Sequence, residues 1–351
     1  MVISRQAHKI LNDPERIMHR NLWFKRLEHL FDNEPDAYLQ QNVFAVDGIL
    51  GISYDRDLIY TDPEAWVVES LENLAENIDL ARSDLMFKPA CMESALFGVH
   101  FTDKIFGADV FFQDDQWYNR PLPISIGSLL YPDLEENPVW TLAKRVALAF
   151  VEQDVCLPLF GLPTIASALN IGVNLFNEEI LAAMLSDPEA AAHDLAVINR
   201  LLCDMHTWYR RHIPVMQLQP VISWNRTQPP GYGQLCGCTT QLVSSGLYRA
   251  MVSALDDALL AVYPNGGMIH LCGAHTHLIS VFRDMPHLRA IQINDRAAAD
   301  IKKYFEGLRS DQVIYLNPCE EMSIEEGVAI TGGKRLVIAQ TIGAPIKPGI
   351  S

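Results

Sequence analysis

The stretch MIHLCGAHTHLISVFRDMPHLRAIQINDRAAADIKKYFEGLRSDQVIYLNP, residues 268–318, decides the fold of this chain. Short apolar runs that end in polar residues alternate in it with segments of helical spacing. We expect strands at MIHLCG, LRAIQIND and VIYLNP, and helices at THLISVFRDM and AAADIKKYFEGL. Strands that alternate with helices of this length indicate a parallel sheet with helical crossovers.

The same alternation continues on both sides of this stretch. Further strands are expected at ADVFFQDD, VCLPLFGLP, PVMQLQPVISW and GQLCGCTTQ, and RLVIAQTI would be the last strand. These runs are almost continuously apolar, which is typical of strands that are covered on both faces. About eight strand–helix units fit, which favours a (β/α)8 TIM-type barrel over an open sheet. We expect one barrel domain over residues 41–351, after an N-terminal helical extension over residues 1–40.

One of the expected helices has a particularly regular pattern. The segment SSGLYRAMVSALDDALLAVY, residues 244–263, is amphipathic. Its apolar stripe is expected to pack on the barrel and consists of Leu247, Met251, Leu255, Leu259 and Val262.

The composition is that of a large acidic globular protein. The 351 residues are 49% hydrophobic, and 43 acidic against 27 basic side chains give a formal net charge of −16. Such a charge repels phosphate backbones, so nucleic-acid binding is not expected. No apolar run reaches the ~18 residues of a transmembrane helix, and the amphipathic N-terminus lacks the apolar core of a signal peptide. We therefore expect a cytoplasmic protein without membrane association.

A (β/α)8 barrel gathers its chemistry at the C-terminal ends of its strands. Several of the predicted strands end in polar residues that we expect to face one mouth: Asp114, Asp115, Cys236, Cys238, His270, Cys272, Asn294, Asp295, Asn317 and Cys319. We select Asp295 and Asn317 as the catalytic residues that orient a substrate. A capping or loop role is an equal alternative for each of these two residues.

The histidine and cysteines of this set predict a metal site. His270 and Cys272 are two positions apart on a strand, so their side chains point to the same side. Cys236 and Cys238 have the same spacing at the end of the preceding strand, and Cys319 ends a strand two further round. Thiolate and imidazole ligands select zinc over magnesium or calcium. We predict zinc bound by His270 and Cys272. The third ligand would be Cys319 or Cys238, and the alternative is that these cysteines are small apolar core residues.

The remaining cysteines and the neighbouring histidines are given other roles. All seven cysteines are expected to be free thiols or metal ligands rather than disulfides. Cys91, Cys156 and Cys203 are interpreted as core residues. His275 and His277 are expected to face solvent or to begin the next helix, with proton transfer near the mouth as the alternative.

The second half of the chain resembles the uroporphyrinogen decarboxylase superfamily. The resemblance rests on CGCTTQLVSSGLYRAMVSALDDAL, MIHLCG, LRAIQIND, VIYLNP and RLVIAQT, and more loosely on SALFGVHFTDKIFGADVFF and LPLFGLPTIASALNIGV. It covers about residues 40–345 and implies a single barrel with an N-terminal helical extension. The decarboxylases carry an Arg-Gln-Ala-Gly-Arg motif on the first strand, which holds the porphyrinogen's carboxylates. QQNVFAVDGIL stands in that place and has no arginine, so decarboxylation of uroporphyrinogen is not expected.

The cobalamin-dependent methyltransferases are the other branch of this superfamily. Members that resemble this chain carry His-x-Cys on a barrel strand and a cysteine after the last strand, and these residues bind zinc. His270-Leu271-Cys272 matches the first part, whereas AQTIGAP after the last strand has no cysteine, so Cys238 or Cys319 would complete the site.

The resemblance implies a zinc-dependent methyltransferase. It would exchange a methyl group between a corrinoid on a corrinoid-binding partner protein and a thiol or methylated small molecule. One alternative is a decarboxylase or lyase that acts on a small carboxylated substrate. Another is a non-catalytic barrel that binds a corrinoid or tetrapyrrole. A homodimer is a possible assembly.

Overall fold

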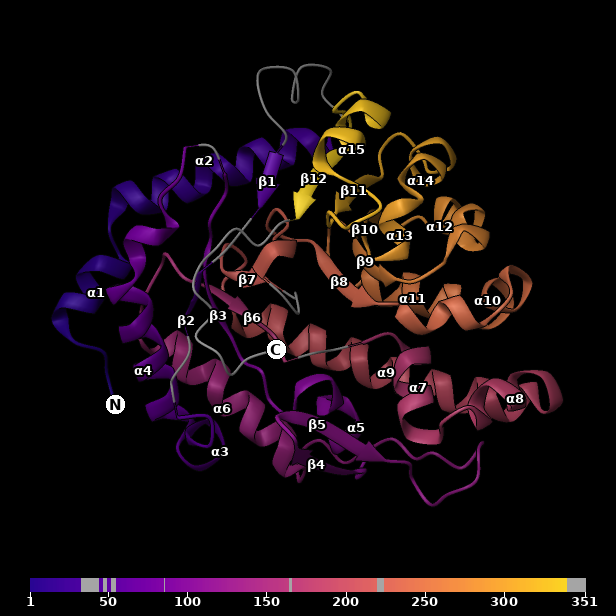
Figure 1. Ribbon diagram of the computed structural model, residues 1–351. Coiled ribbons are helices and arrows are strands. Elements are labelled where there is room, and N and C mark those ends of the chain that lie inside the picture. Colours follow the sequence, from indigo (N-terminus) through magenta and orange to yellow (C-terminus); the bar gives the residue numbers. More distant parts are fainter. Residues whose placement is uncertain are drawn as a thin grey trace.

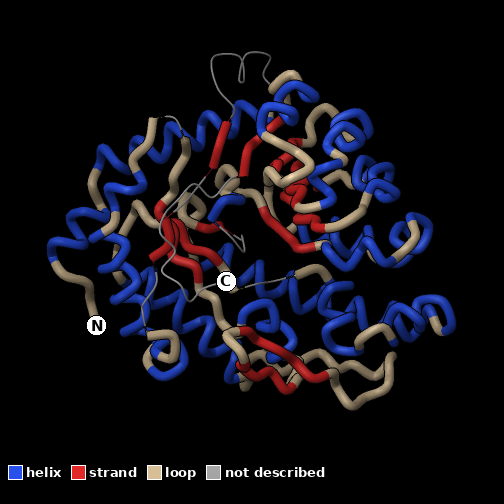
Figure 2. The backbone as a smooth tube through the Cα atoms, in the orientation of Figure 1, coloured by secondary structure: helices blue, strands red, loops and turns tan. Residues whose placement is uncertain are grey.

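Two parallel sheets form the centre of the molecule, and most helices lie around them (Figure 1, Figure 2). The structure is a computed structural model that describes residues 1–32, 44–46, 49–51, 55–84, 86–163, 166–219 and 224–339. The chain is therefore a mixed α/β protein with parallel sheets, as the alternation of strands and helices predicts.

The larger sheet contains the strands of the stretch that decides the fold. Its order is β1-β12-β11-β10-β9-β8, and the pairs are all parallel. The strands are β1 (Phe44–Val46), β8 (Gly233–Cys236), β9 (Gly267–Cys272), β10 (Leu288–Asn294), β11 (Val313–Leu316) and β12 (Leu336–Ala339). MIHLCG, LRAIQIND and VIYLNP thus form the adjacent strands β9, β10 and β11, as predicted.

The smaller sheet has the order β2-β3-β6-β7 and is also parallel. Its strands are β2 (Ile49–Gly51), β3 (Ala90–Glu93), β6 (Leu159–Gly161) and β7 (Leu218–Gln219). Only two residues separate β1 from β2, so the chain passes directly from the edge of one sheet to the edge of the other. Apart from the pair of β1 with β12, neighbouring strands in the two parallel sheets follow the order of the chain.

The run ADVFFQDD does not belong to either parallel sheet. It forms β4 (Asp109–Gln113), which pairs antiparallel with β5 (Gln116–Arg120) in a separate hairpin. Asp114 and Asp115 are the two turn residues, with φ of 50° and 58°. Aspartate tolerates this left-handed conformation, which a two-residue hairpin loop requires. The prediction that these two aspartates end a central strand is therefore wrong.

The helices surround the strands, and several lie directly against the outer face of the sheets (Figure 1). They are α1 (Arg5–Leu11), α2 (Pro14–Phe31), α3 (Leu58–Thr61), α4 (Pro63–Glu76), α5 (Phe101–Ile105), α6 (Pro138–Glu152), α7 (Ala168–Phe176), α8 (Glu179–Ser186), α9 (Pro188–His212), α10 (Ser245–Met251), α11 (Ser253–Leu260), α12 (Ile279–Asp284), α13 (Arg296–Ala299), α14 (Ile301–Gly307) and α15 (Ile324–Thr331). Among the described residues, no helix combines the length and the apolar character that crossing a lipid bilayer demands.

Alternate strand residues belong to two different apolar clusters. Ile269, Leu271, Ile291 and Ile293 pack outward against the helices. The residues between them face inward, where one cluster combines both sheets with α2. This inner apolar cluster consists of Trp23, Phe24, Leu27, Leu30, Phe31, Phe87, Cys91, Leu159, Tyr232, Met268, Ala290, Val313, Tyr315, Val337 and Ala339.

The inner face changes character toward the C-terminal ends of the strands. Two positions after the apolar residues Cys91, Met268 and Ala290 stand Glu93, His270 and Gln292. Because side chains alternate along a strand, these polar groups point to the same side as the apolar residues that precede them. The fold therefore places a layer of polar side chains directly above the inner apolar cluster.

Candidate metal site

The register of the large sheet aligns Cys236 on β8, His270 on β9 and Gln292 on β10 in one row. Beyond Cys236 the pairing continues for one residue, because the Gly237 amide donates to the carbonyl oxygen of His270 at 2.9 Å. The chain then turns into a short 3-10 helix, η4 (Cys238–Leu242).

Gly237 makes this tight turn sterically acceptable. A Cβ at this position would lie 2.6 Å from Cδ1 of Ile269. The Cys-Gly-Cys sequence therefore lets the backbone pass close to β9 and brings Cys238 back to the row.

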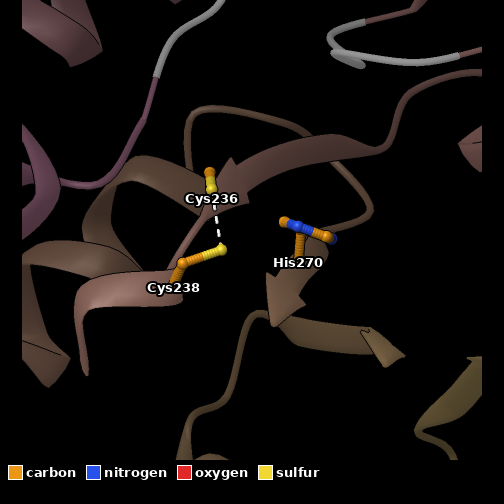
Figure 3. A group of neighbouring side chains, drawn as sticks. All are labelled: Cys236, Cys238 and His270. Carbon is orange, nitrogen blue, oxygen red and sulfur yellow. Dashed lines mark hydrogen bonds between the residues drawn. The ribbon is translucent and has the colours of Figure 1, made fainter. Parts of the chain in front are cut away.

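Three potential ligand atoms converge here (Figure 3). The ligand atoms of Cys236, Cys238 and His270 all lie within 4.8 Å of one another. The two sulfur atoms are 3.4 Å apart. Ligands of one tetrahedral zinc ion at about 2.0–2.3 Å are themselves roughly 3.3–3.8 Å apart. The sulfur–sulfur distance therefore fits a zinc ion, and two thiols with an imidazole are a donor set that zinc prefers.

A third thiol, that of the predicted ligand Cys272, lies beside this group but outside the mutual 4.8 Å spacing of its three ligand atoms. Hydrogen bonds with Cys238 and then with His270 lower the pKa of the Cys272 thiol to about 4. The hydrogen bond with Cys238 likewise lowers the pKa of Cys236 to about 6. The pKa of Cys238 is raised by the same bonds, first by that with Cys236. The thiols thus share hydrogen bonds that favour the thiolate form within the cluster, and thiolates are the form that binds metal.

His270 is held by side chains of the neighbouring strands. Its Nδ1 atom donates to Oε1 of Gln292, and Nε2 of Gln292 donates to Oδ1 of Asn317. Because Nδ1 is the donor, Nε2 of the neutral ring is left as the acceptor that can ligate a metal. Gln292 is fully buried, so water does not compete for these hydrogen bonds.

Residues of α7 support the other side of the cluster. The side-chain amide of Asn170 donates to Sγ of Cys236 at 3.7 Å and accepts from the backbone amide of Thr239 at 3.1 Å. The Ser167 amide donates to the carbonyl oxygen of Cys236 at 2.9 Å. These contacts fix the loop that carries Cys236 and Cys238, and the amide donor favours the thiolate form of Cys236.

The predicted residues Cys319 and Asp295 are placed together, apart from this row. The Cys319 thiol donates to the carbonyl oxygen of Asp295 at 3.7 Å, and its backbone bridges to Met322. Burial raises the pKa of Cys319, whereas those of Cys236 and Cys272 are lowered. Asp295 is exposed. Of the predicted site residues, the structure therefore gathers Cys238, His270, Cys272 and Asn317.

The other expectations for histidine and cysteine are met in part. His275 is buried rather than facing solvent, but it begins the short 3-10 helix η5 (Thr276–Leu278) as its N-cap, and its Nε2 atom lies 3.3 Å from the carbonyl oxygen of Cys238. His277 is exposed, as expected, and its Nε2 donates to the carbonyl oxygen of Val243 at 2.9 Å. Cys156 is exposed and is not a core residue. The reason is that Cys156 follows α6 in a loop rather than lying within the strand β6.

Two charged residues near the cluster were not selected from the sequence. Glu93 ends β3, and Arg226 ends the short 3-10 helix η3 (Trp224–Arg226). Burial raises the pKa of Glu93 to about 7, partly offset by the charge of Arg226. Burial lowers the pKa of Arg226, opposed first by the charge of Cys236 and then by that of Glu93. Glu93 follows an apolar run, which is the same signal that marked the other strand-end residues.

A surface cavity with a volume of about 300 Å³ lies elsewhere. It is lined by residues of α2, including Arg16 and His19, and by Ala90 and Leu157. Ala90 begins β3, and Leu157 precedes β6, so the cavity is at the N-terminal ends of the strands. It is therefore at the opposite end from the cysteines.

No protein-family model matches the chain, and no curated protein matches it in sequence. Among solved structures, a methyltransferase from Methanosarcina mazei is similar, with a TM-score of 0.62 and 12% sequence identity. The similarity covers 93% of this chain and 94% of that chain. At this identity it shows the fold alone: the chain shares the architecture of a solved methyltransferase over almost its whole length.

Proposed function

We propose that the protein is a zinc-dependent methyltransferase that exchanges a methyl group between a corrinoid on a partner protein and a thiol or methylated small molecule. The observation that carries this proposal is the convergence of Cys236, Cys238 and His270 within 4.8 Å at the C-terminal ends of parallel strands. The likeness to a solved methyltransferase supports it.

The proposal includes a closed (β/α)8 barrel over residues 41–351. Inner residues of both sheets share one apolar cluster, and β1 leads directly into β2. In the proposed barrel, β1 with β2 and β7 with β8 each occupy one strand position, which gives eight positions in chain order. The mouth at the C-terminal ends is then where catalytic groups are found in such barrels.

Each residue of the cluster has a proposed task. Cys236, Cys238 and His270 hold the zinc ion, and Cys272 is the candidate for a fourth ligand. Gln292 keeps the Nδ1 proton of His270 in place, so that Nε2 is free. A bound zinc ion would supply Lewis acidity, which keeps a thiol as thiolate or polarises an ether oxygen. The inner apolar cluster below excludes water from that side.

The third thiol, that of Cys272, favours a second candidate function. A site with three cysteines and one histidine as ligands has the closed donor set of structural zinc. In that case the protein would be a non-catalytic, zinc-stabilised barrel. Chelation would then lower the melting temperature strongly, whereas a catalytic zinc with an open position should affect activity more than folding.

Methyl transfer can be followed through the absorbance of the cobalt centre. The purified protein is mixed with methylcobalamin and a panel of thiols, and with reduced cobalamin and a panel of methyl ethers and methylamines. We expect turnover with at least one pair, its loss after chelation and its return with zinc. Cys236→Ser should be inactive and folded, and Cys203→Ser, a half-buried cysteine of α9, should be active. Full turnover by metal-free Cys236→Ser would refute the zinc mechanism.

A further inference from the structure

Arg226 is a half-buried cation, and two of its nitrogen atoms have no partner among the described residues. These are Nε and Nη1, which are themselves buried. The charges that act on it are those of Cys236, Glu93, Cys238 and Cys272. It therefore lies near both the cysteine cluster and Glu93. A buried guanidinium that satisfies no anion is costly, so such a residue is expected to meet a ligand.

Glu93 is the matching unpartnered anion. It makes no side-chain hydrogen bond with any described residue, and no nitrogen of Arg226 comes within 4.0 Å of its carboxylate oxygens. Its position over β6 is tight, because a Cβ at Gly161 would lie 3.2 Å from Cγ of Glu93. The two opposite charges thus interact across a gap instead of forming an ion pair.

The segment that carries Arg226 is fixed inside the fold. The carbonyl oxygen of Thr227 accepts from the hydroxyl group of Tyr315, an inner residue of β11, at 3.0 Å. Gln219 and Gln228 exchange two hydrogen bonds, at 2.9 and 3.1 Å, and so close the loop that contains η3. Arg226 is therefore held in place by the backbone around it and not by its own side chain.

Unpaired polar atoms are concentrated in this segment. Among the described residues, further buried atoms without a partner are Oε1 of Gln228 and both Oε1 and Nε2 of Gln234. Gln234 precedes Cys236 by two positions on β8, so the two side chains share a face. Buried donors and acceptors are nearly always hydrogen-bonded, so a group of unpaired ones indicates a binding site for a polar ligand.

We propose that Arg226 and Glu93 bind the α-carboxylate and the α-ammonium group of an amino acid whose sulfur atom reaches the Cys236–Cys238–His270 cluster. This inference rests on the proposed function, because the sulfur would be the group that exchanges the methyl. A guanidinium binds a carboxylate with paired, charge-assisted hydrogen bonds, and a carboxylate accepts from an ammonium group. Because Arg226 and Glu93 do not pair with each other, a zwitterion can bind both of them, with its carboxylate at Arg226 and its ammonium group at Glu93. The substrate class is therefore a sulfur-containing α-amino acid.

A matched series of thiols tests this recognition. L-Homocysteine carries both charges, 4-mercaptobutyrate lacks the ammonium group, 3-aminopropane-1-thiol lacks the carboxylate, and 1-propanethiol lacks both. Binding is measured on cobalt(II)-substituted protein through the sulfur-to-cobalt charge-transfer absorbance. L-Homocysteine should bind most tightly, with each missing charge weakening binding roughly 10- to 100-fold. Equal binding of all four thiols would overturn the proposal.

Two variants assign the two charges. Arg226→Gln should weaken L-homocysteine and 4-mercaptobutyrate but leave the two thiols without a carboxylate unchanged. Glu93→Gln should weaken L-homocysteine and 3-aminopropane-1-thiol only. The controls are Arg145→Gln and Glu64→Gln, which break an ion pair at the surface, between α6 and α4. Variants that weaken all four thiols alike, or none of them, would contradict the assignment.

Stability separates ligand binding from a structural role. Arg226→Gln removes an unsatisfied buried charge, so its melting temperature should equal or exceed that of the wild type. A large fall would mark Arg226 as structural and overturn the proposal, and Arg226→Lys then shows whether the charge or the shape is needed.

A metal-free measurement separates this inference from the proposed function. L-Norvaline has a methyl group in place of the homocysteine thiol, and its binding to chelator-treated protein is measured by calorimetry. Recognition of L-norvaline that depends on Arg226 and Glu93 would support the inference even if cobalt and zinc fail to bind. Metal binding without charge-selective recognition would support the metal site and overturn the inference.

Discussion

The Nδ1 atom of His270 donates a hydrogen bond to Oε1 of Gln292, and this contact selects the tautomer of the imidazole. An amide oxygen only accepts, so Nδ1 carries the proton and Nε2 is the free nitrogen. The side-chain amide of Gln292 is held against a flip, because its Nε2 donates to Oδ1 of Asn317. Asn317 is thus placed behind the cluster, where it orients Gln292.

Replacing Gln292 should weaken metal binding without removing a ligand. Gln292→Leu keeps the bulk of the side chain but leaves Nδ1 of His270 without its acceptor, so the ring can rotate or change tautomer. Partners of this kind contribute about 10- to 100-fold in metal affinity. Competition with a chromophoric chelator measures the change. Gln153→Leu, which removes another buried glutamine near the N-terminus, serves as the control, and equal losses in both would disprove the role of Gln292.

Zinc content should depend on Cys236, Cys238 and His270 and not on Cys91 or Cys319. As purified, the protein should hold about one zinc per chain, as expected for a single tetrahedral site. Cys236→Ser, Cys238→Ser and His270→Gln should each lose most of it, because they remove ligand atoms of the compact group. Cys91→Ala and Cys319→Ser should retain it. Elemental analysis measures the zinc content of the purified variants. If Cys319→Ser loses as much zinc as Cys236→Ser, Cys319 after β11 is a ligand and the proposed ligand set is wrong.

The apolar stripe predicted over residues 244–263 is divided between two helices, with α10 ending at Met251 and α11 beginning at Ser253. Leu259 is 1% exposed, whereas Leu255 is only half-buried against the core. Leu259→Ala should therefore destabilise the protein by about 2–5 kcal/mol. Leu255→Ala should cost clearly less, since fewer of its atoms leave an apolar environment. Urea denaturation measures both free energies of unfolding, and the reverse order would contradict the burial of α11.

Asp256 should make the protein less stable as the pH rises. Burial, followed by the charge of Asp257, raises its pKa to about 7, although the Tyr248 hydroxyl group donates to it at 2.7 Å. In the unfolded chain this carboxyl titrates near pH ~3.9. Between about pH 4 and 7 the folded state therefore holds more protons than the unfolded state, so stability falls with rising pH over this interval and levels off above it.

Asp256→Asn tests this dependence because an amide does not ionise. Its gain in stability over the wild type should be larger at pH 8 than at pH 5, by roughly 1–3 kcal/mol. Denaturation of both proteins at the two pH values supplies the comparison. A difference that is the same at both pH values would mean that Asp256 does not change its charge in this range.

The sequence predicted those features that depend on local pattern. The apolar runs at β9, β10 and β11 were found from their spacing, because a buried strand needs no information beyond its own residues. The proximity of Cys238 to His270 follows from the rule that adjacent parallel strands end at one edge of a sheet. The hairpin β4–β5 was missed because the run before Asp114 has the same apolar character as a central strand.

Other parts of the site depend on contacts that no local pattern contains. Cys236 has the same spacing from Cys238 in the sequence as His270 has from Cys272. Its choice as a ligand, however, depends on the turn at Gly237. Gln292 carries no sequence signal of its own, since its role arises from the register between β9 and β10. Arg226 and Glu93 are separated by more than a hundred residues in the chain and come near each other only in the folded structure.

The burial of α2 among strands from both sheets has a consequence for the synthesis of the protein. Arg289 donates to the carbonyl oxygen of Phe31 at 2.8 Å across 258 positions of sequence, and the Phe31 ring lies 6.3 Å from that of Tyr315. A ribosome that adds ~5–20 residues per second needs roughly 15–60 s between these two aromatic residues. During that time the apolar face of α2 lacks its final partners and is open to chaperones or to aggregation. The helix α2 therefore reaches its native environment only after residues more than 250 positions later in the chain have been made.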